Sequence, residues 1–241
     1  MRLLIIRPQP GADATARRFK DAGYTPVVMP LFAIEHLPLK SVSVEGYDAI
    51  LLTSGNAARA AHIFLQAATD IPIYAVGSAT AKALANLSLS VAAIGSNGVE
   101  ELVGVAAADG HKKLLWLAGE DHSAVPQIAG VDIDTAVVYR SAILETPAQF
   151  ATNVEQCDAV ILHSSRAASH FAGLCDAAGL SRSKIALATF SNSIAESAGK
   201  GWAHMIVAAS PNDAALMEAI GQHFPTTDCA PSSNAAIEGA T

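Results

Sequence analysis

Two kinds of segment alternate along the chain: short, uninterrupted apolar runs, and longer alanine-rich stretches with apolar positions at helical spacing. The uninterrupted runs predict strands buried on both faces, as in parallel sheets that helices cover. The expected strands are 3–6, 27–29, 49–52, 73–76, 91–94, 114–117, 136–138, 160–162, 185–188 and 205–207. The expected helices are 14–22, 57–66, 79–87, 98–108, 167–178, 193–199 and 213–223. This alternation predicts an α/β fold with parallel sheets.

The pattern also nearly repeats itself. The stretch 47–58 returns as 157–168, so that Asp158 follows Asp48 by 110 positions, and the first strand returns near 112–117. Each half therefore predicts one α/β lobe of about a hundred residues, large enough for its own core.

Two segments, 30–38 and 139–147, break the rhythm at matching places in the repeat. Both are extended in pattern and end in a proline, which opposes a helix. We expect them to run side by side as a two-stranded link, with the first βα unit joining the lobe built from the second half. The predicted division is 1–32 plus 147–224 for lobe 1, 39–137 for lobe 2, 33–38 and 138–146 for the connectors, and 225–241 for a disordered tail.

Composition narrows the class of protein. Hydrophobic residues make up 51% of the chain and charged residues 15%, but no uncharged apolar run approaches the roughly 18 residues of a membrane-spanning helix. The apolar run at the start is too short for a signal peptide, so we expect a cytoplasmic protein. The net charge of −7 argues against nucleic acid as a partner, because nucleic acid requires a basic surface.

The usual signatures of metal, nucleotide and covalent chemistry are missing from the sequence. Cys157, Cys175 and Cys229 have no CxxC spacing and the eight histidines are dispersed, so we expect ordinary thiols and no metal. There is no G-x-S-x-G, P-loop or HExxH motif. The glycine pattern at 95–98 fits the start of a helix better than a nucleotide site. We therefore expect no cofactor.

Four hydroxyl-rich turns follow predicted strands, where parallel sheets bind ligands and helix N-termini offer free N–H groups. Their candidate ligand-binding residues are Thr53, Ser54, Asn56, Gly77, Ser78, Thr80, Ser164, Ser165, Arg166, Ser191 and Ser193. For any single turn, capping of the helix is the more common role. The near absence of Asp and Glu from all four favours an anionic ligand, which an acidic cap would repel.

Further polar residues have two open interpretations. Arg7 ends the first strand, either as a solvated charge or as a cation for a ligand carboxylate. Tyr139 closes the predicted strand 136–138, so its hydroxyl could face a cleft between lobes, or its ring could pack at an interface. His122 and His163, in turns of the two lobes, leave the same alternatives open.

These motifs, in this order, resemble the uroporphyrinogen-III synthase family up to about Gly221. The motifs that carry the resemblance are Arg7-Pro8, Thr53 to Ala57, Val76 to Ala81, Val138-Tyr139, Ser164-Ser165, and Ser210-Pro211 to Leu216. The resemblance implies two flavodoxin-like lobes joined by a two-stranded ladder. It implies a carboxylate-rich linear tetrapyrrole, hydroxymethylbilane, as substrate, cyclised to uroporphyrinogen III with inversion of the final ring and loss of water.

By the same resemblance, Tyr139 is the weak acid near the leaving hydroxyl, no cofactor or metal is needed, and hydroxymethylbilane synthase is a transient partner of a monomeric enzyme. Because the bilane also cyclises unassisted to the wrong isomer, the enzyme must chiefly hold its two ends in position. Two departures concern the substrate loops: Phe190 stands where the family often keeps a glycine, and His122 and Ser123 stand near its usual basic residue.

Two other classes of function compete with this interpretation. One is a two-lobed binding or regulatory module that takes an anionic metabolite without turnover. The other is a nucleotide-dependent α/β enzyme, which the missing phosphate motif disfavours.

Overall fold

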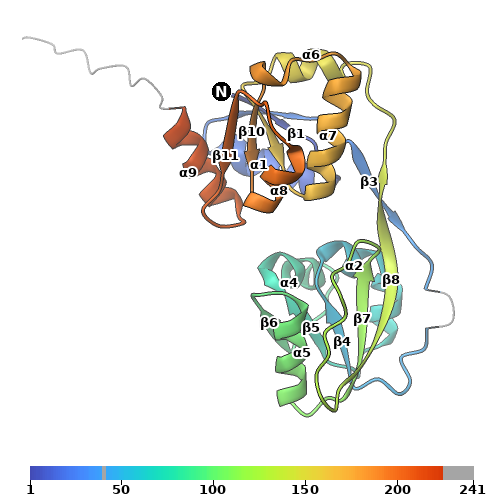
Figure 1. The fold of residues 1–241 in the computed structure, drawn as a ribbon. Helices are drawn as coiled ribbons and strands as arrows, with labels where there is room; N and C mark the ends of the chain where they lie inside the picture. The colour runs from blue at the N-terminus through green and yellow to red at the C-terminus, as the bar shows by residue number, and fades with distance from the viewer. Residues whose placement is uncertain (40–41, 225–241) are drawn as a thin grey trace, which may run out of the picture. The chain divides into compact units, whose positions relative to one another are not determined.

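The computed structural model describes residues 1–39 and 42–224 (Figure 1). Its contacts divide the chain into two compact units. Unit 1 combines Met1–Leu31 with the chain from Thr146 onward, and unit 2 is Phe32–Glu145. The chain therefore passes between the units twice. The predicted tail, with Cys229, lies outside the described residues.

Unit 1 contains a five-stranded parallel sheet in the order β11-β10-β9-β1-β2. Its strands are β1 (Arg2–Ile5), β2 (Thr25–Val28), β9 (Ala159–Leu162), β10 (Ala186–Thr189) and β11 (His204–Val207). Its helices are α1 (Gly11–Asp21), α6 (Phe150–Glu155), α7 (Ser165–Ala177), η1 (Arg182–Lys184), α8 (Asn192–Ala198) and α9 (Asp213–His223). Helices α1 and α9 pack together. Helices α7 and α8 also pack together (Figure 1).

Unit 2 contains a six-stranded sheet in the order β3-β8-β7-β4-β5-β6, parallel except where β3 meets β8. Its strands are β3 (Phe32–His36), β4 (Ala49–Leu52), β5 (Ile73–Val76), β6 (Ala93–Gly95), β7 (Lys113–Gly119) and β8 (Asp132–Ile143). Its helices are α2 (Gly55–Ala60), α3 (His62–Ala67), α4 (Gly77–Ala85) and α5 (Val99–Ala108). The predicted class, α/β with mostly parallel sheets, is confirmed.

The two units share one strand order although the chain enters them at different strands. When the strands of unit 1 are numbered 1 to 5 along the chain, their order across the sheet is 2-1-3-4-5, the flavodoxin-like arrangement. By the internal repeat, β7 and β8 of unit 2 are equivalent to β1 and β2 of unit 1. They are the last strands of unit 2 along the chain, whereas β1 and β2 are the first strands of unit 1. The repeat is thus circularly permuted between the units.

An aspartate precedes the central strand of each unit, Asp48 before β4 and Asp158 before β9, and it has the same structural role in both. The Asp48 carboxylate accepts backbone N–H bonds from Lys112 and Lys113 at 2.8 and 2.9 Å. The Asp158 carboxylate accepts the N–H of Arg2 at 2.6 Å. The bonds from the Lys112 and Lys113 N–H groups lower the pKa of Asp48. Each aspartate therefore ties the start of the neighbouring strand, β7 or β1, to the central strand.

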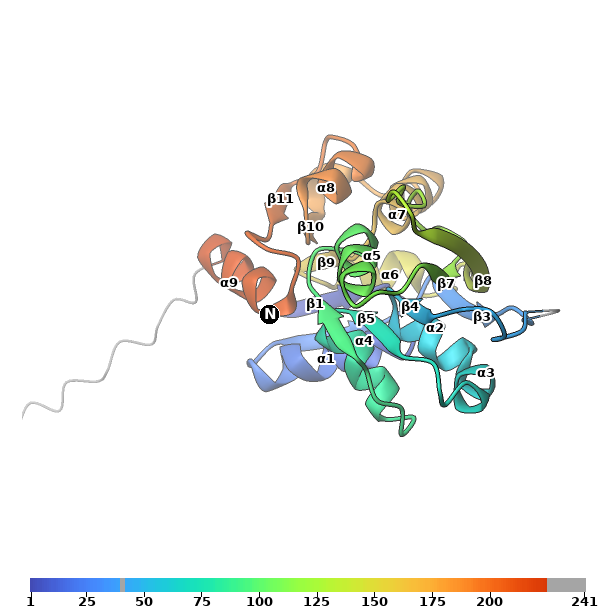
Figure 2. The ribbon, with the colours of Figure 1, turned by 90° about the horizontal axis from the view of Figure 1, so that it is seen from below.

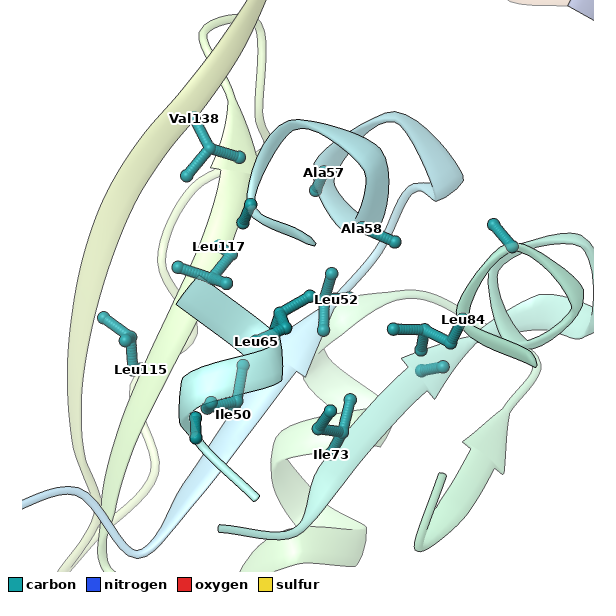
Figure 3. Close-up of a cluster of buried hydrophobic side chains, with 14 residues drawn as sticks. Ile50, Leu52, Ala57, Ala58, Leu65, Ile73, Leu84, Leu115, Leu117 and Val138 are labelled. Atoms are coloured by element: carbon teal, nitrogen blue, oxygen red, sulfur yellow. The ribbon is translucent and has the colours of Figure 1, made fainter. Parts of the chain in front are cut away.

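Strand β4 shows how the apolar runs build two cores. All four of its residues are buried, and alternate side chains point to opposite faces of the sheet. Ile50 and Leu52 pack with α2, α3 and α4 in the cluster of Figure 3. Ala49 and Leu51 pack on the α5 side, so that helices cover both faces of the sheet (Figure 2). This explains the uninterrupted apolar runs.

The two predicted connectors pair as antiparallel strands. β3 runs against the end of β8 with Ala33 opposite Ala142, and Glu35 opposite Arg140. The Arg140 Nε atom lies 2.7 Å from a carboxylate oxygen of Glu35, on the exposed surface. The structure differs from the prediction in that β8 is one continuous strand, which joins the predicted strand 136–138 to the second connector.

Several element boundaries also differ from the sequence prediction. The predicted helix 57–66 is two helices that meet at Ala61, and no glycine or proline marks the break. Helix α6 was not predicted, because six residues are too few for a helical period to stand out. Within the described residues, no helix has the length and apolar character needed to span a membrane.

Candidate functional site

The carboxyl ends of the strands carry the turns on which the sequence analysis centred. After β4, β5, β9 and β10 the chain enters α2, α4, α7 and α8, and none of these four helices has Asp or Glu in its first turn. An anion at these edges therefore meets no carboxylate at the four helix starts.

Serine hydroxyls cap three of these four helices. The bonds run from the N–H groups of Asn56, Ala167 and Ile194 to the hydroxyl oxygens of Ser54, Ser164 and Ser191, over 3.1, 3.2 and 3.4 Å. Capping is therefore one real role of these residues. A hydroxyl that accepts such a bond keeps its own hydrogen, which it can donate to a ligand oxygen.

The start of α4 differs from the other three. Gly77 has φ +76° and already belongs to the helix, so the residue at the cap position is Val76, which has no side-chain acceptor. Ser78 is exposed and Thr80 is buried inside the first turn. Ser78 and Thr80 thus lie within the helix rather than at its cap, and the first backbone N–H groups of α4 lack a side-chain cap.

Other hydroxyls of the predicted set bind within the protein. Thr53 accepts a bond from the Trp116 indole N–H at 3.3 Å, which ties it to the packing of unit 2. In unit 1, the Ser165 hydroxyl donates to the Ser193 carbonyl at 3.3 Å and so links α7 to α8. The Ser193 hydroxyl lies 3.0 Å from that of Ser191. Arg166 lies exposed in the first turn of α7.

Tyr139 lies at a break in the pairing of β7 with β8. Ala118 pairs with Val137 but Gly119 pairs with Tyr139, so that Val138 is an extra residue in the ladder. In a regular strand Val138 and Tyr139 would point to opposite faces. Here both contact the cluster that packs under α2 and α4. The bulge therefore turns Tyr139 toward α2.

Gly119 makes room for the ring of Tyr139. A Cβ atom at position 119 would lie 2.5 Å from Tyr139 Cζ and 2.7 Å from its hydroxyl oxygen, closer than real Cβ contacts allow. The Gly119 backbone has no positive φ, so a glycine is needed here for space rather than for conformation. The Tyr139 carbonyl also accepts the N–H of Glu120 at 2.9 Å, which holds the two strands together at the bulge.

Arg59 is a further candidate residue, which the sequence pattern did not single out. One turn into α2, its guanidinium donates a hydrogen bond to the Asn56 side-chain oxygen. The charge of Arg59 also interacts with Tyr139, while burial lowers its pKa. Its spacing of three from Asn56, which puts both on one side of a helix, was the available signal. Asn56, Arg59 and Tyr139 thus gather on one side of unit 2.

Arg7 occupies the corresponding edge of unit 1. Its guanidinium is half-buried and donates to the buried Thr15 hydroxyl at 3.2 Å. Arg18 donates to the same oxygen at 3.4 Å, but Arg18 is also bound by the carboxylate of Asp213. Burial is the main cause of the lowered pKa of Arg7, with Asp213 opposing and Arg18 reinforcing it. Arg7 is thus a fixed cation whose acceptor is neutral.

His163 lies beside this arginine cluster at the end of β9. Its ring lies 4.7 Å from that of Phe190, centroid to centroid. Both ring nitrogens are buried, and among the described residues neither has a hydrogen bond of good geometry beyond a weak contact with the Ile161 backbone. Burial lowers the pKa of His163 well below its usual value, and the charges of Arg7 and Arg18 lower it further. His163 is therefore held as a neutral imidazole.

Two further sequence candidates make contacts within unit 2. At positions 95–98 the Glu101 carboxylate accepts the N–H groups of Ser96 and Asn97 at 3.2 and 2.6 Å, so this turn is capped by an acid. The His122 ring packs 5.0 Å from that of Trp116. Among the described residues, no three His, Cys, Asp or Glu side chains gather closely enough to hold a metal ion.

The depressed pKa of His163 predicts a stability loss in mild acid. Below about pH 6.5 the unfolded chain binds a proton that the folded chain does not, so acidification from pH 8 to pH 5.5 lowers the unfolding free energy by about 1 kcal/mol through this group. In urea titrations at both pH values, His163→Phe should lose less stability on acidification than the wild type. His36→Gln, which removes an exposed histidine, serves as the control. An unchanged pH dependence in His163→Phe would contradict the prediction.

The Gly119–Tyr139 contact predicts a coupling between these positions. Gly119→Ala should cost about 1–3 kcal/mol of stability, because the added methyl group overlaps the ring. The same change in a Tyr139→Ala background should cost little. Urea unfolding followed by Trp116 fluorescence, with Trp202 replaced by Phe, measures both costs. Equal costs in the two backgrounds would show that the ring is not the obstacle.

The motifs and geometry can be compared with known proteins. Residues 13–218 match the family model described as uroporphyrinogen-III synthase HemD. None of the curated protein sequences compared with the chain matches it.

Two solved structures show the same fold. The chain is similar to uroporphyrinogen-III synthetase from Helicobacter pylori, with a TM-score of 0.60 and 18% identity over 93% of this chain and 100% of that one. It is also similar to a mutant uroporphyrinogen III synthase from Thermus thermophilus, with a TM-score of 0.51 and 14% identity over 93% and 98% of the two chains.

At these identities the structural likeness concerns the fold, and it agrees with the two sheets described above. The family model adds the sequence pattern, and it spans both units, from the first turn of α1 to α9. The chain belongs to the uroporphyrinogen-III synthase family.

Proposed function

We propose that this chain cyclises hydroxymethylbilane to uroporphyrinogen III, with inversion of the final ring and loss of water, which makes it a hydro-lyase of tetrapyrrole biosynthesis. The observation that carries the proposal is the family match over residues 13–218. The non-catalytic binding module remains the alternative in principle, but none of the comparisons favours it.

The chemistry of the carboxyl edges supports this substrate. The bilane is rich in carboxylates, and the protein carries a net charge of −7, so the two repel at long range. Recognition must therefore be local. Helix starts without acids, serine O–H groups and the half-buried Arg7 supply such local contacts in unit 1, and Ser54 with the uncapped start of α4 does so in unit 2.

Tyr139 is the residue we assign to proton donation. A phenol is a weak acid that can protonate the leaving hydroxyl as the bond to carbon breaks, so that water departs. The bulge and the space at Gly119 support this role, because they hold the ring in one orientation near the carboxyl edge. The rest of the rate gain comes from holding the two ends of the bilane together.

The remaining expectations are part of the same proposal. We infer a monomer that works in the cytoplasm without a cofactor or metal. Its substrate is unstable toward unassisted cyclisation, which favours direct, transient contact with the hydroxymethylbilane synthase that makes it.

The product isomer tests the function. Hydroxymethylbilane generated in the assay should give the type I isomer without this protein and the type III isomer with it, as separated by chromatography. Type I alone in the presence of folded protein would rule out the activity. Binding of the bilane, measured by calorimetry, without an isomer shift would instead favour the binding module.

Tyr139→Phe tests the proton donor. The variant keeps the ring over Gly119 but loses the hydroxyl, so kcat should fall by about 100-fold while KM stays within about threefold. Tyr47→Phe is the matched control, because it also loses one hydroxyl of unit 2, which binds Asp134 at 2.8 Å. An unchanged kcat in Tyr139→Phe would leave Tyr139 as a packing residue.

A further inference from the structure

Arg59 lies folded back along α2. Its Nη2 atom donates to the Asn56 side-chain oxygen, and its Nη1 atom would lie 3.5 Å from a Cβ atom placed on Gly55. The guanidinium therefore lies beside the first turn of α2, at the carboxyl edge of the sheet, rather than extending into solvent. One side-chain hydrogen bond, to Asn56, holds it there.

The side-chain acceptor of Arg59 is neutral, as is that of Arg7. Carboxylates bind other arginines of the described residues, as in the pairs Arg18–Asp213, Arg140–Glu35 and Arg182–Asp176. Arg59 binds a neutral amide oxygen, and none of the carboxylates in the described residues forms an ion pair with it. A guanidinium has five N–H donors in a planar fork, so most of them remain available for an anion.

The environment of Arg59 strengthens any bond to an anion. The side chain is partly buried, and this burial lowers its pKa, because a cation loses hydration there without gaining a counterion. A carboxylate that reached the guanidinium would restore that lost interaction through short, charge-assisted bonds. The cation is thus fixed in place before the ligand arrives.

Arg59 also lies close to the residue assigned to the chemistry. Helix α2, which carries Arg59, packs against β8, and the bulge in β8 turns Tyr139 toward the cluster under α2. A carboxylate bound to Arg59 would therefore place the group that carries it beside the Tyr139 hydroxyl.

We propose that Arg59 is a substrate-binding residue that takes one carboxylate of the bilane next to Tyr139, and that Asn56 is the positioning residue that orients its guanidinium. This inference rests on the proposed function, and it adds a residue of unit 2 whose positive charge binds the substrate. It also changes the part assigned to Asn56, from direct contact with the substrate to orientation of Arg59.

Three variants separate binding from structural support. Arg59→Gln removes the charge, and Arg59→Lys keeps the charge without the fork. Asn56→Asp gives Arg59 a carboxylate of its own and so competes with the substrate. Arg17→Gln removes one exposed positive charge from unit 1 and is the matched control. The measurements are kcat and KM for type III formation, fluorescence titration with the stable carboxylate-rich porphyrin uroporphyrin III, and urea unfolding.

We expect Arg59→Gln to raise KM and weaken porphyrin binding by about tenfold or more, with kcat within about threefold. Arg59→Lys should recover part of the loss. Asn56→Asp should weaken binding as much as Arg59→Gln while leaving the protein at least as stable, a combination that a merely structural role of the pair does not produce.

Unchanged binding in Arg59→Gln, or Asn56→Asp that binds as the wild type does, would overturn the proposal. The proposal would also be overturned if Arg59→Gln lost porphyrin binding only because the variant unfolds, while Asn56→Asp bound the porphyrin normally. Failure of the wild type to form the type III isomer would instead count against the proposed function, and the porphyrin titration would still decide whether Arg59 binds carboxylates.

Discussion

Both units depend on the parallel pairing of their central strand with its neighbour. The pair is β4 with β7 in unit 2 and β9 with β1 in unit 1. In each unit an aspartate before the central strand, Asp48 or Asp158, accepts backbone N–H groups at the start of its neighbour. This fixes where the strands start, and hence where they end. Because parallel strands end at one edge, the turns that follow them meet there. The same edge in each unit thus collects helix starts, hydroxyls and the half-buried arginines.

The two roles of the serine-rich turns are compatible rather than competing. A capping serine uses an oxygen lone pair to accept a backbone N–H, and its own hydrogen stays free for another acceptor. Acid-free caps therefore stabilise the helices and leave donors at the edge. An aspartate in the place of Ser54, Ser164 or Ser191 would cap equally well, but it would offer a negative charge and no hydrogen to donate.

The sequence predicted the sheet-forming elements well, because strands buried on both faces are uninterrupted apolar runs such as 49–52 and 160–162. It predicted the site less completely. Arg7 and Tyr139 could be placed at strand ends, but a bulge is a property of paired strands, so the orientation of Tyr139 was not readable from one strand alone. The hydrogen bond of Thr53 was not predictable for a similar reason, because its donor, the indole of Trp116, lies on the neighbouring strand β7. Arg59 was missed because an arginine inside a predicted helix resembles a solvated one until its hydrogen bonds are known.

The circular permutation has a consequence for synthesis on the ribosome. Unit 2 is one continuous segment, Phe32–Glu145, and its strands are all available once that segment has emerged. Unit 1 is not: β1 and β2 leave the ribosome first, but β9, the partner of β1, begins at Ala159. The first strands must therefore remain unpaired with β9 while the whole of unit 2 is made, and the oldest part of the nascent chain is among the last to complete its sheet.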